Sequence, residues 1–585
     1  MLLPDLSMKT LGPEEAMQKC KVFQERRRNA KGLHILFKFP ILAIILLIIA
    51  FDMLCYFLLR IFIFLSERLL TSSKRSQLLY KARMAKHYEE WKEYNSKLDV
   101  LEGNEEWKEF PESSYYNQDI IKANLKRLNH ILSTSLSPQH KMAQKQLDLD
   151  DIKFIERCCI PNVGGIGNYH MYTNCRVGTK KVTHEYVKSL DKVVKAICSE
   201  DSSLSSKERQ QFIENVERSY GRTALILSGG ATFGFYHWGV VKALLEQNIL
   251  PSVISGTSAG SLLAALVCVQ KNEDILELIS PDAYTFCKVF LNWFEMVKNY
   301  IKNGSMRDNE DYRQMAEDFM RSDIKDITFM EAFQKTGKVL NISCSVDGNK
   351  VYPGRQLNYI TAPNCIISSA VVASAAVPVL LRPQPLLYKE ADGCIKKRES
   401  ESFVWRDGGF KNDLPMKELG AAFNVNNFIV SQVNPHILPF FFWNSGSPGK
   451  PTSRNWRGGF CLSYMEAYLK LDMKKWANLI NQMEIFPELF GHDLTELFLQ
   501  ETFGEITIAP SPNLMNYLQF LSNVDSKRLE KYIQSGCYYT WPNISMINNT
   551  YLLEKTIREC KKELHCNHHE MIDTSVIGKR KHGDS

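Results

Sequence analysis

At 585 residues the chain is too long for one ordinary domain, and two to four folded units are expected. Its 44% hydrophobic and 23% charged residues are typical of a globular protein and exclude a disordered or fibrous chain. The net charge of +7 gathers near the N-terminus, which disfavours nucleic acid as a partner. The basic cluster at residues 26–31 suits anionic lipid headgroups or an ordinary solvated face.

The first long pattern in chain order is an apolar segment at residues 39–65, interrupted by Asp52 and Arg60. A membrane span needs about 20 such residues, and a carboxylate at its centre costs about 2.5–3.5 kcal/mol. Positive charge flanks both ends, which favours a re-entrant hairpin broken near Asp52, or an in-plane embedding in a monolayer, slightly over a true span. A buried helical hairpin is the soluble alternative. No small-residue cleavage site follows, so we expect the segment to remain in the mature protein.

The remaining chain divides by pattern into further regions. Mixed charged and apolar residues predict a helical accessory domain at 66–220, with a polar linker or cap at 202–206. Apolar strands at 223–227, 252–255, 339–345 and 427–433 then alternate with helices, which predicts a mostly parallel sheet covered on both faces. We thus expect a basic segment at 1–38, a membrane-embedded segment at 39–65, the accessory domain, a catalytic α/β domain at 221–436, a helical extension at 437–570 that includes 464–498, and a disordered basic tail at 571–585.

A G-x-S-x-G sequence, Gly256-Thr257-Ser258-Ala259-Gly260, follows the second predicted strand and opens a helix. A nucleophile elbow is a sharp turn that requires small residues two positions before and after the serine, as Gly256 and Gly260 are. Isolated G-x-S-x-G sequences are common. The prediction that Ser258 is a nucleophile therefore depends on the location of this motif between a predicted strand and a predicted helix.

An activated serine also needs donors for an oxyanion. The glycine-rich stretch at 229–234 follows the first predicted strand and supplies backbone N–H groups. A phosphate loop or a dinucleotide fingerprint fits poorly, since neither G-K-[ST] nor G-x-G-x-x-G spacing occurs there. The 15 cysteines form no CxxC pair and no zinc-type spacing, which predicts reduced cytosolic thiols and no metal site. We expect no cofactor.

A serine nucleophile requires a general base. Asp407, in Arg406-Asp407-Gly408-Gly409, follows a predicted strand at 403–405, and its two glycines permit a tight loop. A histidine is the rival base, with His237 and His436 the candidates. Neither histidine lies in a supporting motif.

Four ordered motifs together resemble the patatin-like phospholipase domain: the glycine-rich loop, the elbow, Ala373-Ser-Ala-Ala-Val-Pro378 and Asp407-Gly-Gly. The resemblance covers roughly residues 225–433 and implies a three-layer α/β/α sandwich. The accessory region is similar to the N-terminal domain of fungal and plant intracellular triacylglycerol lipases.

This resemblance implies a dyad in which Ser258 attacks the ester carbonyl and Asp407 takes its proton, with an oxyanion hole formed by Gly229, Gly230 and Ala231. Two positions depart from the family pattern: Ala231 replaces the third loop glycine, and Phe233 replaces a basic residue. The missing basic side chain favours neutral lipids over phospholipids. The resemblance also implies a lipid droplet or endoplasmic reticulum location, with the catalytic domain facing the cytosol.

The expected activity is hydrolysis of triacylglycerol to diacylglycerol and fatty acid at a droplet or membrane surface. Two alternatives remain open: phospholipase or lysophospholipid acyltransferase activity, and a non-catalytic droplet scaffold. The H-x-x-x-x-D sequence at 568–573 matches an acyltransferase motif but is a chance match among 13 histidines. Protein partners remain open.

Overall fold

The computed structural model describes residues 38–63, 65–66, 73–134, 147–279, 291–321, 323–324, 326–347, 355–398, 403–410, 413–438, 448–449, 459–483, 500, 502–511 and 514–580. The expected segment 1–38 lies outside these residues except for Lys38. The chain forms two compact units. The small unit comprises Met1–Arg68 and Gly458–Leu499, and the large unit comprises Leu69–Arg457 and Gln500–Ser585.

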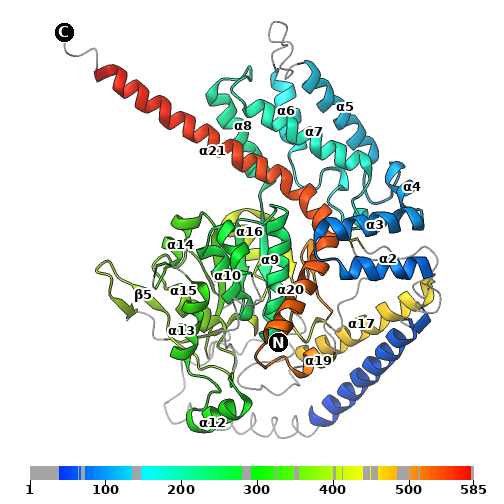
Figure 1. Cartoon of the computed structure of the whole chain (residues 1–585), viewed down its shortest axis with the longest axis vertical. Coiled ribbons are helices and arrows are strands. Elements are labelled where there is room, and N and C mark those ends of the chain that lie inside the picture. Colours follow the sequence, from blue (N-terminus) through cyan, green and yellow to red (C-terminus); the bar gives the residue numbers. More distant parts are fainter. Residues whose placement is uncertain are drawn as a thin grey trace, which may run out of the picture. The chain divides into compact units, whose positions relative to one another are not determined.

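The described part of the small unit consists mainly of two helices far apart in sequence, the apolar helix Lys38–Ile63 and α17 (Gly459–Gln482). The apolar helix has a mean hydropathy of 2.8 and is long and apolar enough to cross a membrane, judged by length and composition. It continues unbroken through Asp52, so the expected hairpin broken near Asp52 is wrong. Figure 1 shows α17 in yellow beside the apolar helix in blue. Ile480 of α17 packs against Leu42 and Ile45 of the apolar helix. Of the helix expected at 464–498, residues 484–498 lie outside the described part.

The accessory region of the large unit is helical, as its sequence predicts. Its α-helices are α2 (Ser73–Met84), α3 (Tyr88–Glu102), α4 (Asn104–Glu109), α5 (Gln118–Thr134), α6 (Leu149–Cys158), α7 (Lys181–Cys198) and α8 (Ser206–Tyr220). The predicted polar cap is present: the Ser205 hydroxyl accepts the Glu208 N–H, and the Glu208 carboxylate accepts the Ser205 N–H. This reciprocal capping box satisfies two amides at the start of α8.

The α/β domain is built on a sheet of seven strands. They are β1 (Arg222–Leu227), β2 (Val253–Gly256), β3 (Val339–Val346), β4 (Arg355–Leu357), β7 (Trp405–Asp407), β8 (Val425–Ser431) and β9 (Ile506–Ile508). The order is β4-β3-β2-β1-β8-β9, with β7 also paired to β3. Strands β3, β2, β1, β8 and β9 run parallel, and β4 and β7 pair antiparallel with β3. The predicted mostly parallel sheet is thereby confirmed. A separate hairpin joins β5 (Leu387–Lys389) to β6 (Ile395–Lys397).

Helices of the α/β domain connect and cover these strands. They are α9 (Tyr236–Glu246), α10 (Ala259–Val269), α11 (Asn272–Leu278), α12 (Trp293–Asn303), α13 (Asn309–Met320), α14 (Phe329–Thr336), α15 (Ile367–Ser374) and α16 (Met416–Phe423). Alternate residues of β1 serve the two faces of the sheet. Leu225 and Leu227 join the cluster that contains α9 and α10, whereas Ala224 and Ile226 pack with α16.

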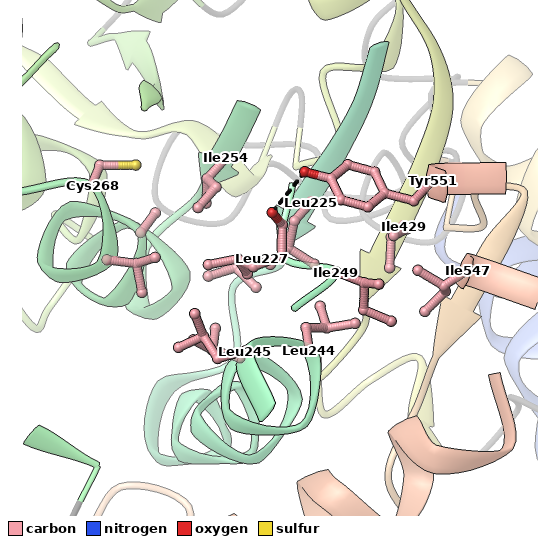
Figure 2. Close-up of a cluster of buried hydrophobic side chains, with 14 of the residues drawn as sticks. Leu225, Leu227, Leu244, Leu245, Ile249, Ile254, Cys268, Ile429, Ile547 and Tyr551 are labelled. Carbon is pink, nitrogen blue, oxygen red and sulfur yellow. Dashed lines mark hydrogen bonds between the residues drawn. The ribbon is translucent and has the colours of Figure 1, made fainter. Parts of the chain in front are cut away.

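The C-terminal extension is helical, with α19 (Leu514–Leu518), α20 (Ser526–Thr540) and α21 (Ile544–Arg580), and it also supplies β9 to the sheet. Figure 2 shows Ile547 and Tyr551 of α21 among the buried side chains of β1, β8 and α9, where the Tyr551 hydroxyl donates to the Leu250 carbonyl at 3.0 Å. Helix α21 continues to Arg580, into the segment 571–585 that the sequence analysis expects to be disordered. Residues 581–585 lie outside the described part.

Candidate active site

Ser258 lies in the tight turn between β2 and α10. Its backbone has φ 53° and ψ −122°, a conformation that L-residues rarely adopt and that marks a strained turn. A Cβ at Gly256 would lie 2.4 Å from the Gly260 carbonyl oxygen, and one at Gly260 would lie 2.2 Å from the Leu227 carbonyl oxygen. Only glycine therefore fits at either position, and the turn leaves Ser258 partly exposed at the end of the sheet.

Strand β7 lies next to the elbow because it pairs with the second half of β3, whereas β2 pairs with the first half. Ile342 of β3 pairs with β2 on one side and β4 on the other. Two residues later, Cys344 pairs with β4 and with Asp407 of β7. Strands β2 and β7 therefore pair with the same side of β3, and β7 begins to pair where β2 ends at the elbow. This register brings Asp407 beside Ser258.

Asp407 is only 3% exposed, and its carboxylate receives two hydrogen bonds. One comes from the Ser258 hydroxyl, and the other from the Gly409 N–H at 2.6 Å. Burial raises the pKa of Asp407 to about 7, although both hydrogen bonds oppose this shift. A carboxylate with a pKa near neutrality, bonded to a serine hydroxyl, can accept the proton of that hydroxyl at physiological pH.

The two glycines after Asp407 allow the chain to turn against the sheet. A Cβ at Gly408 would lie 2.5 Å from the Ser343 carbonyl oxygen, so a larger residue would push β7 away from β3. At Gly409 a Cβ would lie 3.0 Å from the Asp407 carboxylate. The loop thus depends on both glycines.

The glycine-rich loop lies between β1 and α9. The Gly229 N–H, expected to stabilise an oxyanion, instead donates to the buried Asp413 carboxylate at 3.0 Å. A carboxylate is a strong acceptor, so this amide is already engaged. Gly230 and Ala231 are partly exposed, as Ser258 is, and their amides remain the candidate oxyanion donors. Ala231 has φ 50°, where glycine is favoured, so the departure from the family glycine costs backbone strain.

Asp413 is a residue that the sequence analysis missed. It is 4% exposed, and burial raises its pKa to about 6. Besides binding Gly229, its carboxylate accepts the Asn434 side-chain N–H at 2.6 Å, and its carbonyl accepts the Thr257 hydroxyl at 3.0 Å. Asp413 therefore ties together the glycine-rich loop, the elbow and the end of β8. Its position four residues after the Asp407-Gly-Gly motif is the sequence feature that could have identified it as a candidate site residue.

Ser374 supports the elbow from the Ala373-Ser-Ala-Ala-Val-Pro motif, to which the sequence analysis assigned no role. Its hydroxyl accepts the Ser258 N–H at 2.9 Å and donates to the Ser343 carbonyl at 2.8 Å. The strained backbone of Ser258 is thereby linked to β3.

The two candidate histidines differ from Asp407 in their surroundings. His237 is fully buried, with Nε2 3.0 Å from the Ser228 carbonyl oxygen and Nδ1 2.6 Å from the Ser431 hydroxyl. Since a carbonyl only accepts, Nε2 carries the proton and Nδ1 accepts from Ser431. Burial lowers the pKa of His237 to about 4, so the ring is neutral. Both ring nitrogens form hydrogen bonds to Ser228 and Ser431, and neither can accept a proton from Ser258. His436 lies half-buried beyond β8.

Comparison with known proteins gives a consistent description. The model of the patatin-like phospholipase family matches residues 225–419, and that of a domain of unknown function, DUF3336, matches residues 68–218. A patatin-like phospholipase domain-containing protein of Pyricularia oryzae is 37% identical over 550 residues, covering 91% of this chain and 69% of the relative. One from Neosartorya fischeri is 35% identical over 537 residues, covering 90% and 75%. The crystal structure of VipD from Legionella pneumophila aligns with 13% identity and a TM-score of 0.27, covering 56% of this chain and 67% of that chain.

Proposed function

The chain belongs to the patatin-like phospholipase family of lipid hydrolases, and from this premise we propose that it is a serine lipase that hydrolyses triacylglycerol to diacylglycerol and fatty acid. The observation that carries the proposal is the hydrogen bond from the partly exposed Ser258 hydroxyl to the buried Asp407 carboxylate. A nucleophile and a base in direct contact need no third residue to move the first proton.

In the proposed mechanism, Asp407 accepts the Ser258 proton as Oγ attacks the ester carbonyl. The amides of Gly230 and Ala231 stabilise the oxyanion, while the Gly229 amide holds the loop on Asp413. The ester bond breaks, and diacylglycerol leaves with the proton from Asp407. Water then attacks the acyl-serine, Asp407 takes a proton from that water, and the fatty acid leaves as Ser258 regains its proton.

The surroundings of Phe233 support a neutral substrate. Its side chain is fully buried and packs in a cluster with Tyr236, Val433 and Tyr532. At this position the family pattern has a basic residue, which could attract an anionic headgroup. An apolar side chain enclosed in the core offers no such attraction.

The location we propose is the surface of a lipid droplet or of the endoplasmic reticulum, with the catalytic domain in the cytosol. The apolar helix Lys38–Ile63 supports attachment to lipid. The twelve cysteines described as free thiols, most of them buried, are in keeping with a reducing compartment.

The test compares purified full-length protein on trioleoylglycerol emulsions and on phosphatidylcholine vesicles, with products separated by headgroup. We expect oleate and diacylglycerol from the emulsion, much slower release from the vesicles, and no hydrolysis by Ser258→Ala. Preferential release of lysophospholipid, or transfer of the acyl group to an added lysolipid, would favour the alternative activities. Undiminished hydrolysis by Ser258→Ala would overturn the proposal.

A further inference from the structure

The two charges that interrupt the apolar helix both face α17. Arg60 Nη1 lies 3.7 Å from a carboxylate oxygen of Glu466, and Lys470 Nζ lies 3.0 Å from the other. Asp52, which is 7% exposed, shares a hydrogen bond with the carboxyl of Asp472. Asp52 is thus enclosed between the two helices, and Arg60 is partly covered by α17.

The contacts define an antiparallel pair. Arg60, near the end of the apolar helix, meets the first half of α17, whereas Leu42 and Ile45, near its beginning, meet Ile480. Lys470 Nζ also lies 5.9 Å from the centre of the Tyr56 ring, which is fully buried. A buried charge without a partner is costly in an apolar medium, and Glu466 of α17 supplies the partner of Arg60.

The outer surface of the pair is apolar on both helices. On the apolar helix, Leu47 is 70% exposed and Phe51 is 65% exposed. On α17, Tyr464, Tyr468 and Leu471 recur at helical spacing, and they are 61%, 57% and 67% exposed. An apolar surface continued across two helices, with charges turned inward, is the arrangement suited to acyl chains.

The second half of α17 is different, because Lys474 and Lys475 are exposed there. Such a helix is amphipathic along its length, and tyrosine and lysine side chains are favoured at the boundary of the hydrocarbon layer. This distribution indicates shallow embedding of α17 in a lipid surface and disfavours a complete span by this helix.

We infer that α17 enters the lipid surface together with the apolar helix, placing Tyr464, Tyr468 and Leu471 among the acyl chains. The inference rests on the lipid-surface location proposed above and extends it to a segment inserted between β8 and β9. The lipid-embedded part of the protein is then assembled from both halves of the chain.

The first test measures flotation of full-length protein with phosphatidylcholine-coated trioleoylglycerol emulsions, in a Ser258→Ala background so that hydrolysis plays no part. The double variant Tyr468→Asp/Leu471→Asp should bind with at least about tenfold weaker partitioning. The matched control is Val100→Asp/Leu101→Asp on α3, whose side chains are also exposed. Undiminished flotation of the α17 variant would overturn the inference, as would a change in oligomeric mass without a change in flotation.

A second test locates α17 without weakening the binding. Tyr468→Trp adds a fluorescent reporter, and Tyr80→Trp on α2, a position 63% exposed, is its control. With dibrominated phosphatidylcholine, we expect the fluorescence added at 468 to be quenched and that added at 80 to be unaffected. Equal quenching at the two positions would contradict the inference. Neither result depends on the substrate proposed above.

Discussion

At the scale of single residues, the pKa of Asp407 determines how the activity depends on pH. The base must be unprotonated to accept the serine proton, and burial raises its pKa to about 7. We therefore expect kcat/KM for a soluble short-chain ester to be constant above about pH 7 and to fall about tenfold per pH unit below it. A pH profile of the purified protein measures this. An acid limb near pH 4 would indicate a base with an unshifted carboxyl pKa.

Asp413 should act on the reaction through its neighbours. Its negative charge raises the pKa of Asp407, so Asp413→Asn should move the acid limb of the pH profile to lower pH. The variant should also lower kcat, because the carboxylate that holds the Gly229 amide is lost. Asp392→Asn, at the exposed turn between β5 and β6, is the control. A lower rate with an unshifted acid limb would limit Asp413 to a structural role.

At the scale of elements, the strand-turn-helix around Ser258 depends on close backbone contact. Gly256→Ala would place a methyl group 2.4 Å from the Gly260 carbonyl oxygen, and we expect a loss of about 1–3 kcal/mol in the free energy of unfolding. Gly420→Ala is the matched control, because a Cβ there meets the Val425 carbonyl oxygen at 3.3 Å and alanine favours the helix α16. Denaturant unfolding compares the two. Equal midpoints would mean that the elbow is less tightly packed than described.

The central strands were predictable, whereas of the peripheral strands only β7 was predicted in part, by the strand expected at 403–405. Strands β1, β2, β3 and β8 are rich in apolar residues and mostly buried, as parallel strands inside a sheet are covered on both faces. Strands β7 and β9 have three residues each, and their pairing depends on partners far away in sequence. The prediction placed Asp407 directly after a strand at 403–405, whereas Asp407 is the last residue of β7. No local pattern shows that β7 replaces β2 along β3.

The same limit applies to the candidate site. Ser258 and Asp407 stand out in the sequence because glycines lie next to them. In the structure, a side chain at those glycines would clash with neighbouring backbone or side-chain atoms. The engagement of the Gly229 amide by Asp413 is a contact across 184 positions of sequence, with no periodicity to reveal it. The support of Ser258 by Ser374, across 116 positions, is hidden for the same reason.

At the scale of the whole molecule, the C-terminal helix completes the core of the catalytic domain. Ile547 and Tyr551 of α21 are fully buried against β1 and β8, and each such side chain contributes about 1.5–3 kcal/mol. Because domains are stable by only about 5–15 kcal/mol, truncation after Thr540 should prevent folding. Truncation after Arg580 is the control and should leave the thermal midpoint unchanged. A soluble, cooperatively unfolding protein ending at Thr540 would contradict this role of α21.

The most direct test of the account is the rate at which a fluorophosphonate probe labels Ser258, with the adduct located by mass spectrometry. The full-length protein should react at Ser258, and Asp407→Asn should react at least about a hundredfold more slowly, since it lacks the base. His237→Gln, if folded, should be labelled at nearly the rate of the unmodified protein. Rapid labelling of Asp407→Asn together with loss of labelling in folded His237→Gln would contradict the dyad.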